Sequence, residues 1–433
     1  MKNNIYACLE IGSSETRILV CNIRENRIYV LSQQAVETEG VKQGHIVQLN
    51  PLVQKLKALK VQIEADLNQS LQTVILSIPS VNAGIDSLQL ELELEPDELI
   101  GPAQIKRLFR QAMNRPAHSE TVSANLIPRS FAVDGQSPVS NPTGQRGKLL
   151  EMEVQRATAP AMLVYELINA VELAGFRVGD IMVGSAAEVL YSFGFAAAGK
   201  NICHVNIGKA STTISIAHGG KLISTKSLSV GGQDATEDIT EALLVDDKTA
   251  NELKHHFGSL QSKGNSQEFI YINEIESGFS CITRGMLENV LMGRYEMILK
   301  VVKQYLNENS FKIDNIEYVF TGGASEIHGL AEFAKTLLGA EASVQRPSML
   351  GVRNAKFARL TGVAILAHEL ALLTGQNNEI IDFASYASAK GMPAQEAKAG
   401  AALAPDKSFM DHKLENSGVL VRLFDKMFEE KAE

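Results

Sequence analysis

A polar residue followed by a glycine-containing turn occurs twice in this chain, each time between two apolar, β-branched runs. The two copies are 8–20 and 204–216. Their central residues are Glu10, Gly12, Ser13 and Ser14 in the first copy and Asn206, Gly208, Lys209, Ala210 and Ser211 in the second. Each copy is typical of a β-hairpin whose turn N–H groups can face an anion, which predicts phosphate binding. The alternative interpretation is an ordinary pair of core hairpins.

The polar residue, the glycine and a later threonine match between the two hairpins at one constant separation, which predicts two related domains. A predicted strand at 73–78 follows a predicted helix at 51–68, and this order favours a mixed sheet covered by helices. The other glycine-containing turns of interest are Gly231-Gly232 and Gly322-Gly323-Ala324.

At these residues the chain resembles the actin–Hsp70–hexokinase superfamily and, within it, the FtsA family of bacterial cell-division proteins. The resemblance extends from Ala7 to Phe428. It implies an α/β, actin-like fold, which is a duplicated ribonuclease H-like ATPase fold, with ATP and Mg²⁺ as cofactors. It further implies that Glu10 holds a hydrated Mg²⁺, that the residues at 12–14 donate to phosphate oxygens, and that the turn at 322–324 lies against the adenosine.

The segment 81–162 has a different pattern, because 88–94 alternates strictly between apolar and polar residues as a half-exposed strand does. Its Ile-Pro, Val-Asp-Gly and Asn-Pro-x-Gly motifs, at 127–144, resemble the insertion that FtsA carries. The resemblance implies that two helices rich in small residues, 185–199 and 358–367, cross between the domains. The predicted parts are a first domain at 1–80, 163–199 and 346–375, an inserted small α+β subdomain at 81–162, a second domain at 200–345, a flexible linker at 376–417 and a C-terminal helix at 418–433.

Composition and charge exclude several function classes. The formal net charge is −9, with 41 basic and 50 acidic residues, which argues against a nucleic-acid partner bound through bulk charge. The four cysteines form no CxxC pair, so neither zinc nor a disulfide framework is indicated, and Cys8 and Cys203 are expected to be buried. The N-terminus reaches Glu10 too soon for a signal peptide, and no run nears about 18 apolar residues, so we expect a cytoplasmic chain that does not cross a membrane.

Four residues of the expected nucleotide site, at three places in the sequence, depart from the resembling family. Asn206 stands where relatives have aspartate, Lys209 and Ala210 replace glycines, and Asn251 stands where relatives have a glutamate near the ribose and adenine, although Lys254 remains. Phosphoryl transfer depends on placed charge, so these changes argue against efficient hydrolysis. Two interpretations stay open: ATP is a structural ligand that is hydrolysed slowly or not at all, or the fold is a scaffold that binds nucleotide weakly or not at all. No general base is evident; Glu188 is interpreted as exposed or structurally paired.

The resemblance also implies partners. Residues 288–296 resemble the family helix that binds the C-terminal peptide of the division tubulin FtsZ, so Arg294, helped by Arg284, is expected to contact that peptide. The alternative is a solvated arginine on an amphipathic helix. FtsA relatives also assemble into filaments, and the inserted subdomain is expected to contact other divisome proteins.

The chain ends in a segment with an apolar face, which predicts a helix lying in the membrane interface. The residues of this face are Leu420, Leu423, Phe424, Met427 and Phe428. The linker before it has a reach of about 35 Å as a flexible coil. FtsA relatives end in a similar tether, which implies a location at the cytoplasmic side of the cell membrane, at the division site. The alternative is a helix that docks on its own protein or on a partner.

Other classes remain as alternatives to a division protein. A PilM-like scaffold of a type IV pilus machine has a similar insertion but ends soon after the core. An Hsp70-type chaperone would need a substrate-binding β domain, and a sugar or acetate kinase would need a substrate acid that this cleft lacks.

Overall fold

The computed structural model describes residues 4–25, 27–117, 120–193, 201–261, 267–275, 278–308, 315–376 and 380–381. Within them the chain forms two compact units. Unit 1 comprises Met1–Tyr191, Ser348–Val352 and Arg359–Glu433, and unit 2 comprises Ser192–Pro347 and Arg353–Ala358.

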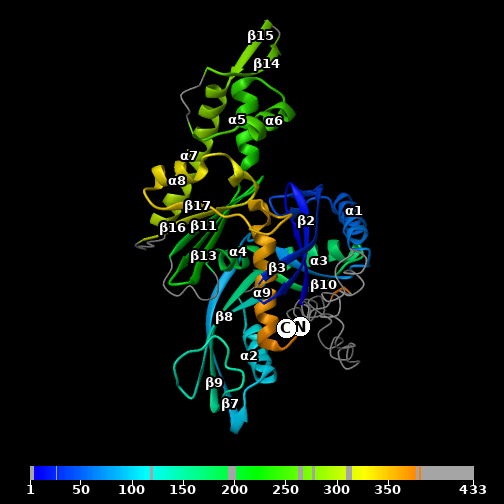
Figure 1. The fold of residues 1–433 in the computed structure, drawn as a ribbon, viewed down its shortest axis with the longest axis vertical. Helices are drawn as coiled ribbons and strands as arrows, with labels where there is room; N and C mark the ends of the chain where they lie inside the picture. The colour runs from blue at the N-terminus through cyan, green and yellow to red at the C-terminus, as the bar shows by residue number, and fades with distance from the viewer. Residues whose placement is uncertain are drawn as a thin grey trace. The chain divides into compact units, whose positions relative to one another are not determined.

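Unit 1 is built on a five-stranded sheet of order β10-β6-β1-β2-β3 (Figure 1). Its central strand β1 pairs antiparallel with β2 and parallel with β6, and every residue of β1 is buried, as expected for a strand covered on both faces. A short hairpin of β4 (Val41–Lys42) and β5 (His45–Ile46) precedes the first helix. The sheet strands are β1 (Ile5–Ile11), β2 (Glu15–Arg24), β3 (Arg27–Glu37), β6 (Thr73–Ile78) and β10 (Arg177–Val183).

The first helix of unit 1 ends at a residue type that is common at helix ends. It ends at Asn68, which takes the left-handed conformation that asparagine tolerates, and its apolar positions at helical spacing are buried. Cys8 lies in the core of this unit and is buried, as expected. The helices are α1 (Leu49–Leu67), α3 (Ala161–Leu173), α4 (Gly184–Phe193) and α9 (Ala358–Thr374).

Between β6 and α3 lies a three-stranded antiparallel sheet of order β7-β9-β8 with one helix, drawn in cyan in Figure 1. The alternating residues of its edge strand β7 are alternately buried and exposed, and the buried ones join a core with the helix. These elements are β7 (Gly84–Leu99), α2 (Pro102–Asn114), β8 (Thr121–Val133) and β9 (Arg146–Pro160).

Unit 2 repeats the sheet of unit 1. Its order is β13-β12-β11-β16-β17, and its central strand β11 again pairs antiparallel with the following strand and parallel with β16. The strands are β11 (Ile202–Ile207), β12 (Thr212–His218), β13 (Lys221–Leu228), β16 (Glu317–Thr321) and β17 (Ala342–Val344). The same connectivity around both sheets is the structural counterpart of the repeated hairpin in the sequence.

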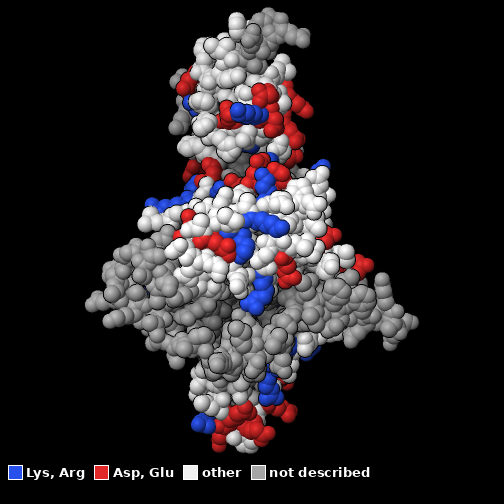
Figure 2. All heavy atoms as spheres, turned by 90° about the vertical axis from the view of Figure 1, so that its right-hand side faces the viewer, with Lys and Arg blue, Asp and Glu red and all other residues white. Residues whose placement is uncertain are grey.

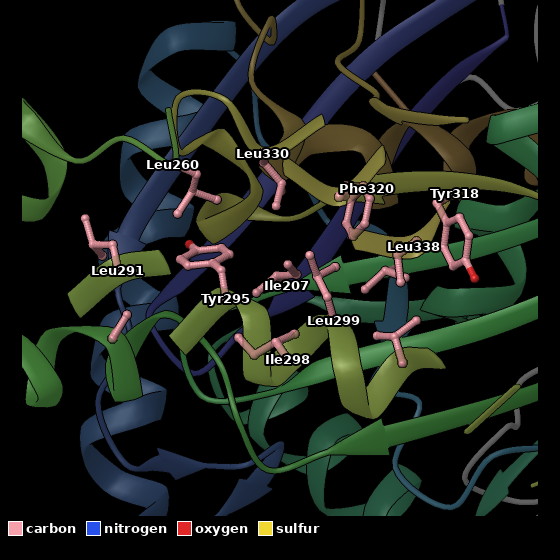
Figure 3. Packing of buried hydrophobic residues seen from close by; sticks show 14 of the residues in the cluster. Ile207, Leu260, Leu291, Tyr295, Ile298, Leu299, Tyr318, Phe320, Leu330 and Leu338 are labelled. Carbon is pink, nitrogen blue, oxygen red and sulfur yellow. The ribbon is translucent and has the colours of Figure 1, made fainter. Parts of the chain in front are cut away.

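Helices and short turns complete unit 2. The longest helix, α7, sends Leu291, Tyr295 and Leu299 into a core that also receives Ile207 and Phe320 from the sheet (Figure 3). Cys203 is buried in the same core, as expected. The elements are α5 (Gly232–Leu243), α6 (Asp247–Phe257), β14 (Phe269–Ile275), β15 (Gly278–Thr283), α7 (Arg284–Glu308), η1 (Gly323–Glu326), α8 (Leu330–Leu338) and η2 (Ala355–Phe357).

One stretch among the described residues, Ala355–Thr374, is long and apolar enough to cross a membrane by length and composition. The sequence expectation that no run reaches this length overlooked it. However, 72% of its apolar window is buried inside the structure, as in the core helix of a folded domain.

Candidate functional site

The first hairpin of unit 1 closes on itself at Gly12. The Gly12 amide donates to the Glu15 carbonyl over 3.1 Å, and a Cβ on Gly12 would lie 2.8 Å from that same oxygen. Glycine is therefore needed for the turn. The prediction that the Gly12 amide donates to phosphate is not supported by this geometry, which leaves the amides of Ser13 and Ser14 as the donors an anion can meet.

Glu10 lies at the end of β1 directly opposite Arg17 of β2. The Glu10 side chain is buried, and both of its oxygens accept from guanidinium groups of unit 1. Arg17 Nη2 lies 3.0 Å from Oε2, and Arg359 Nη1, from the start of α9, lies 3.0 Å from Oε1. The sequence analysis assigned no role to either arginine. The register of the predicted hairpin places Arg17 opposite Glu10 and could have indicated this pair, whereas no local pattern indicates Arg359.

Arg359 also binds a second carboxylate. Its Nε lies 3.2 Å from Glu188 Oε2, and Glu188 is a fully buried residue of α4. Glu188 is thus structurally paired, in line with the sequence interpretation. Burial lowers the pKa of Arg359, but the charges of Glu188 and Glu10 outweigh it and the pKa is raised overall. The four side chains form one buried charge network of two arginines and two glutamates.

The second hairpin, in unit 2, has the same closed turn. The Gly208 amide donates to the Ser211 carbonyl over 2.9 Å. The carbonyls of Gly208 and Lys209 in turn accept from the first amides of α5, Gly232 and Gln233, each over 2.8 Å. The N-terminus of α5 is therefore satisfied by the hairpin itself. The Gly231 amide likewise bonds within the chain, to the Asp234 side chain.

The third glycine turn lies against the second hairpin. Gly322 has φ = +88°, and a Cβ there would lie 2.4 Å from the Ile207 carbonyl and 2.9 Å from Asn206 Oδ1, so only glycine fits. The Asn206 amide donates to Thr321 Oγ1 over 3.2 Å. The next turn residue, Ala324, approaches the start of α5 at Gly232.

Lys254 of α6 joins this group. Its ammonium donates to the Gly232 carbonyl over 2.8 Å and to Thr236 Oγ1. The pKa of Lys254 is lowered to about 8, first by burial and second by the nearby charge of Lys209, with a partial offset from Asp247. Lys209 itself is exposed. Two lysines close enough to repel each other beside glycine turns form a site suited to an anion.

Unit 2 thus brings together most of the residues that were predicted for its half of the nucleotide site. These residues are Asn206, Gly208, Lys209, Gly231, Gly232, Lys254, Gly322 and Ala324. Asn251 is an exposed residue one helical turn before Lys254. No contact of its side chain joins it to the group within the described ranges.

Glu10 forms ion pairs at the position where the resemblance implies a magnesium ion. Mg²⁺ is bound by oxygen ligands. Each Glu10 oxygen accepts one bond from a guanidinium group, which leaves a lone pair on each, and the matching position in unit 2 is the amide Asn206. In the part of the chain that the structure describes, no cluster of three or more His, Cys, Asp or Glu residues suits a metal.

A second feature of unit 2 is a shallow groove of about 450 Å³ between α5 and α7. Arg294 lies in it and binds Asp238 of α5 through both nitrogens of its fork, at 2.6 and 2.5 Å. Arg284 is not among the lining residues; it binds Glu268 over 2.6 Å and covers the ring of Phe257. The groove is lined by Asp238, Glu241, Ala242, Asn289, Val290, Gly293 and Arg294.

Acidic side chains gather on this part of unit 2. Figure 2 shows them in the upper part of the drawn face, where Figure 1 places α5 and α6. The five apolar residues predicted to touch the membrane, in 418–433, lie outside the described residues. Of the predicted linker at 376–417, only 376 and 380–381 are described.

Comparison with known families and relatives agrees with the resemblance seen in the sequence. A family model described as "Cell division protein FtsA" matches residues 203–362, and one described as "SHS2 domain inserted in FTSA" matches residues 86–158. The FtsA protein of Bacillus subtilis is 25% identical over 372 residues, which cover 84% of this chain and 83% of that protein. The FtsA protein of Streptococcus pneumoniae is 25% identical over 85% of this chain and 81% of that protein.

Solved structures share the fold at lower identity. The structure titled "PilM-PilN type IV pilus biogenesis complex" has a TM-score of 0.56 at 17% identity and covers 84% of this chain and 98% of that chain. MreB5 of Spiroplasma citri bound to ADP has a TM-score of 0.51 at 13% identity, covering 86% of this chain and 98% of that chain. The predicted actin-like fold with an inserted subdomain is confirmed. We conclude that the chain belongs to the FtsA family and is an actin-like cell-division protein.

Proposed function

We propose that this chain binds ATP, assembles into filaments and tethers FtsZ to the inner face of the cytoplasmic membrane at the division site. The observation that carries the proposal is the groove between α5 and α7, which lies in the region matched to FtsA and holds the predicted arginine, Arg294.

The nucleotide part of the proposal is supported by Lys209 and Lys254 of unit 2, which lie beside its glycine turns. Fold neighbours of the MreB type have been solved with ADP and with AMPPNP. Asn206 and Lys209 remove features on which phosphoryl transfer depends, so we expect turnover far below the usual enzyme range of about 1–10³ s⁻¹. ATP then acts as a ligand that stabilises one conformation, and its hydrolysis does not drive the function.

The groove presents both signs of charge to a peptide. Arg294 supplies a guanidinium, while Asp238 and Glu241 supply carboxylates from the opposite helix. A peptide carboxylate that binds the Arg294 guanidinium has to displace Asp238 from it. A peptide that also carries a basic residue, which could pair with the displaced Asp238, is therefore favoured. The C-terminal peptide of FtsZ is the partner we propose, with Arg294 as its anchor.

Membrane attachment is proposed through Leu420, Leu423, Phe424, Met427 and Phe428. The glutamates that follow, at 429, 430 and 433, reduce attraction to anionic lipid, so a single helix would bind weakly and filaments would supply avidity. We further propose that the inserted subdomain contacts other divisome proteins.

A vesicle co-sedimentation experiment tests the tether directly. Full-length protein, vesicles and FtsZ are mixed with and without ATP, and FtsZ is measured in the pellet. We expect FtsZ to pellet only when the chain is present, and more strongly with ATP. FtsZ that stays in the supernatant under all conditions would contradict the proposal.

A PilM-like scaffold remains the second candidate, favoured by the structural likeness to PilM over 98% of that chain. The two functions differ in the peptide that binds. Affinity for a short cytoplasmic peptide of a pilus membrane protein, together with none for the FtsZ peptide, would support the scaffold.

A further inference from the structure

Strand β7 of the inserted subdomain has one unpaired edge. It lies on the outside of the sheet of order β7-β9-β8, and among the described residues it pairs with β9 alone. The pairing with β9 keeps one register from Gly84 to Glu93, so the other side of β7 presents a regular row of backbone N–H and C=O groups over the same residues. The backbone of an additional strand can pair with such an edge.

A groove of about 650 Å³ opens on this side of β7. It is lined by β7 and by the C-terminal end of α2, and among the described residues none of β9 lines it. The buried Arg156 holds the two walls together, because its guanidinium donates to the carbonyls of Arg115 and Pro116 and, over 2.8 Å, to the carboxylate of Asp86. The groove is therefore formed before a partner binds, which lowers the cost of binding. The lining residues are Gln89, Leu90, Glu91, Gln111, Asn114, Arg115 and Pro116.

The exposed face of this sheet is acidic. Glu91 and Glu93 of β7 are exposed, whereas the alternating Leu90 and Leu92 are buried in the core that includes α2. The register places Glu91 directly opposite Glu151 of β9, and like charges at such positions weaken a sheet. Within the described ranges, none of these three glutamates has an ion-pair partner. Figure 2 shows acidic side chains at the lower end of the drawn face, where Figure 1 places the ends of β7 and β9.

Protection of the edge does not account for this charge. Charged side chains on an edge strand often prevent pairing with a second copy of the same chain. Glu151, however, belongs to the central strand β9, which has no free edge to protect. An acidic face that extends over both strands repels a second copy of itself and attracts a basic partner.

We propose that the inserted subdomain binds an extended, basic segment of a partner protein, which pairs with the free edge of β7 as an additional strand. The inference rests on the proposed contact between this subdomain and other divisome proteins, and it adds the place of that contact and the chemistry of the partner.

The two faces of the sheet predict a pattern in the partner segment. Side chains of an added strand alternate between the faces. Those on the face of Glu91 and Glu93 should be lysine or arginine, because opposite charges on neighbouring strands attract. Those on the other face lie towards the groove wall of Gln111, Asn114 and Arg115, where a cation would meet the Arg115 charge. The partner therefore carries its cations at every second position, with uncharged residues between them.

The first experiment uses fluorescence anisotropy of full-length protein with a labelled peptide of sequence Lys-Thr-Lys-Val-Lys-Thr-Lys-Val. We expect saturable binding with a Kd below about 1 mM. The same peptide with every backbone nitrogen methylated keeps its charges but loses the donors that a strand needs, so it should bind at least about tenfold more weakly. Absence of saturable binding by the first peptide, or equal binding of both, overturns the inference.

Two further peptides test the pattern and the sign of the charge. In one the lysines are consecutive, at unchanged composition, and in the other glutamate replaces each lysine. Both should bind at least about tenfold more weakly than the alternating peptide. Equal affinity of either peptide overturns the assigned partner chemistry.

A matched pair of variants tests the place. Glu91→Lys should weaken the alternating peptide by about tenfold, whereas Glu317→Lys, at an exposed position of β16 in unit 2, should leave its Kd unchanged. Circular dichroism checks that both variants fold, and equal affinities for the two overturn the assignment to β7. The FtsZ co-sedimentation assay on the same wild-type preparation keeps the proposals apart. FtsZ that pellets while no peptide binds overturns this inference alone, and FtsZ that stays in the supernatant contradicts the tether.

Discussion

Arg359 Nη1 lies 3.0 Å from Glu10 Oε1, although 349 positions separate the two residues in the sequence. The pair ties the start of α9 to the end of β1 inside unit 1, and Glu188 extends it to α4. Three segments that are distant in the sequence therefore share one buried ionic network. The balance of charge in this network, rather than any single bond, determines what a change does.

Replacing Arg359 by methionine should destabilise the protein strongly. The change leaves two buried carboxylates with one guanidinium, and breaking a buried ion pair costs about 3–5 kcal/mol. Urea unfolding would measure the loss. Arg177→Met is the matched control, because Arg177 is an exposed residue of unit 1 that bonds Thr73, and about 0.5 kcal/mol or less is expected. Similar losses of unfolding free energy for both variants would mean that the ionic network does not stabilise the protein.

Gly362→Ala should also destabilise unit 1, for a steric reason. A Cβ on Gly362 would lie 2.3 Å from the carbonyl oxygen of Ala187, so α4 and α9 would have to move apart. We expect a loss of about 1–3 kcal/mol in the free energy of unfolding.

Gly293→Ala is the control for that change. Among the described residues, no heavy atom lies within 4 Å of the Cβ it would add, and the site is an exposed position of α7. Helix propensity then predicts a gain of about 0.5–1 kcal/mol. A gain at Gly362 as well would show that the close approach of the helices is absent in solution.

Arg294→Glu should weaken binding of the FtsZ peptide by about 1–3 kcal/mol, because it removes the charged anchor and places a like charge opposite Asp238. Fluorescence anisotropy with the labelled peptide measures the Kd. Arg284→Glu is a useful comparison, since Arg284 does not line the groove and should have little effect. If only the Arg284 variant loses affinity, the peptide binds elsewhere on α7.

Lys254 predicts a pH dependence of ATP binding. Its pKa in the folded chain is about 8, below the ordinary 10.5, because of burial first and Lys209 second. Protonated Lys254 attracts phosphate, so ATP affinity should be highest below pH 8 and fall towards pH 9. His255 has a pKa lowered below its usual 6.5 and stays neutral over this range. Lys254→Met should flatten the profile; an unchanged slope would assign the titration to another group.

The same shift has the opposite sign for stability. Between about pH 8 and 10.5 the unfolded chain binds the Lys254 proton and the folded chain does not. Stability from this group therefore rises with pH through that window. Thermal melts of the wild type and the Lys254→Met variant between pH 8 and 10.5, without nucleotide, would measure the contribution of Lys254 to the pH dependence of stability.

Deleting 418–433 should abolish vesicle binding, and Phe424→Glu should nearly do so, because each removes the apolar face that enters the interface. Co-sedimentation with vesicles measures both. Truncated protein that pellets as well as the full chain would show that membrane attachment lies elsewhere.

Local patterns in the sequence predicted much of the fold. The hairpin at Glu10, the hairpin at Asn206 and the strand at Thr73–Ile78 were all predicted, since alternation and turn residues act over a few positions. The helix expected at 288–296 lies within α7, which extends beyond it at both ends.

The charge partners could not be predicted in the same way. Nothing in the sequence near Asp238 shows that it faces Arg294, 56 positions away. Arg359 was assigned only to a crossing helix. Such pairs depend on how helices pack, and packing is set by many weak contacts rather than by a motif. Gly12 shows the converse, because a motif can be present while its amide is already used within the turn.

The two helices that line the groove are each tied to a glycine turn of unit 2. The amides at the start of α5 bond the carbonyls of Gly208 and Lys209, and the hydroxyl of Tyr295, next to Arg294 on α7, donates to the Ala324 carbonyl over 2.6 Å. Asp238 follows Gly232 by six residues, about 9 Å along a rigid helix. The helices α5 and α7 therefore contact both the groove and the glycine turns. If a phosphate at the turns changes the affinity of the groove for a peptide, thermodynamic linkage requires the peptide to change phosphate affinity by the same factor.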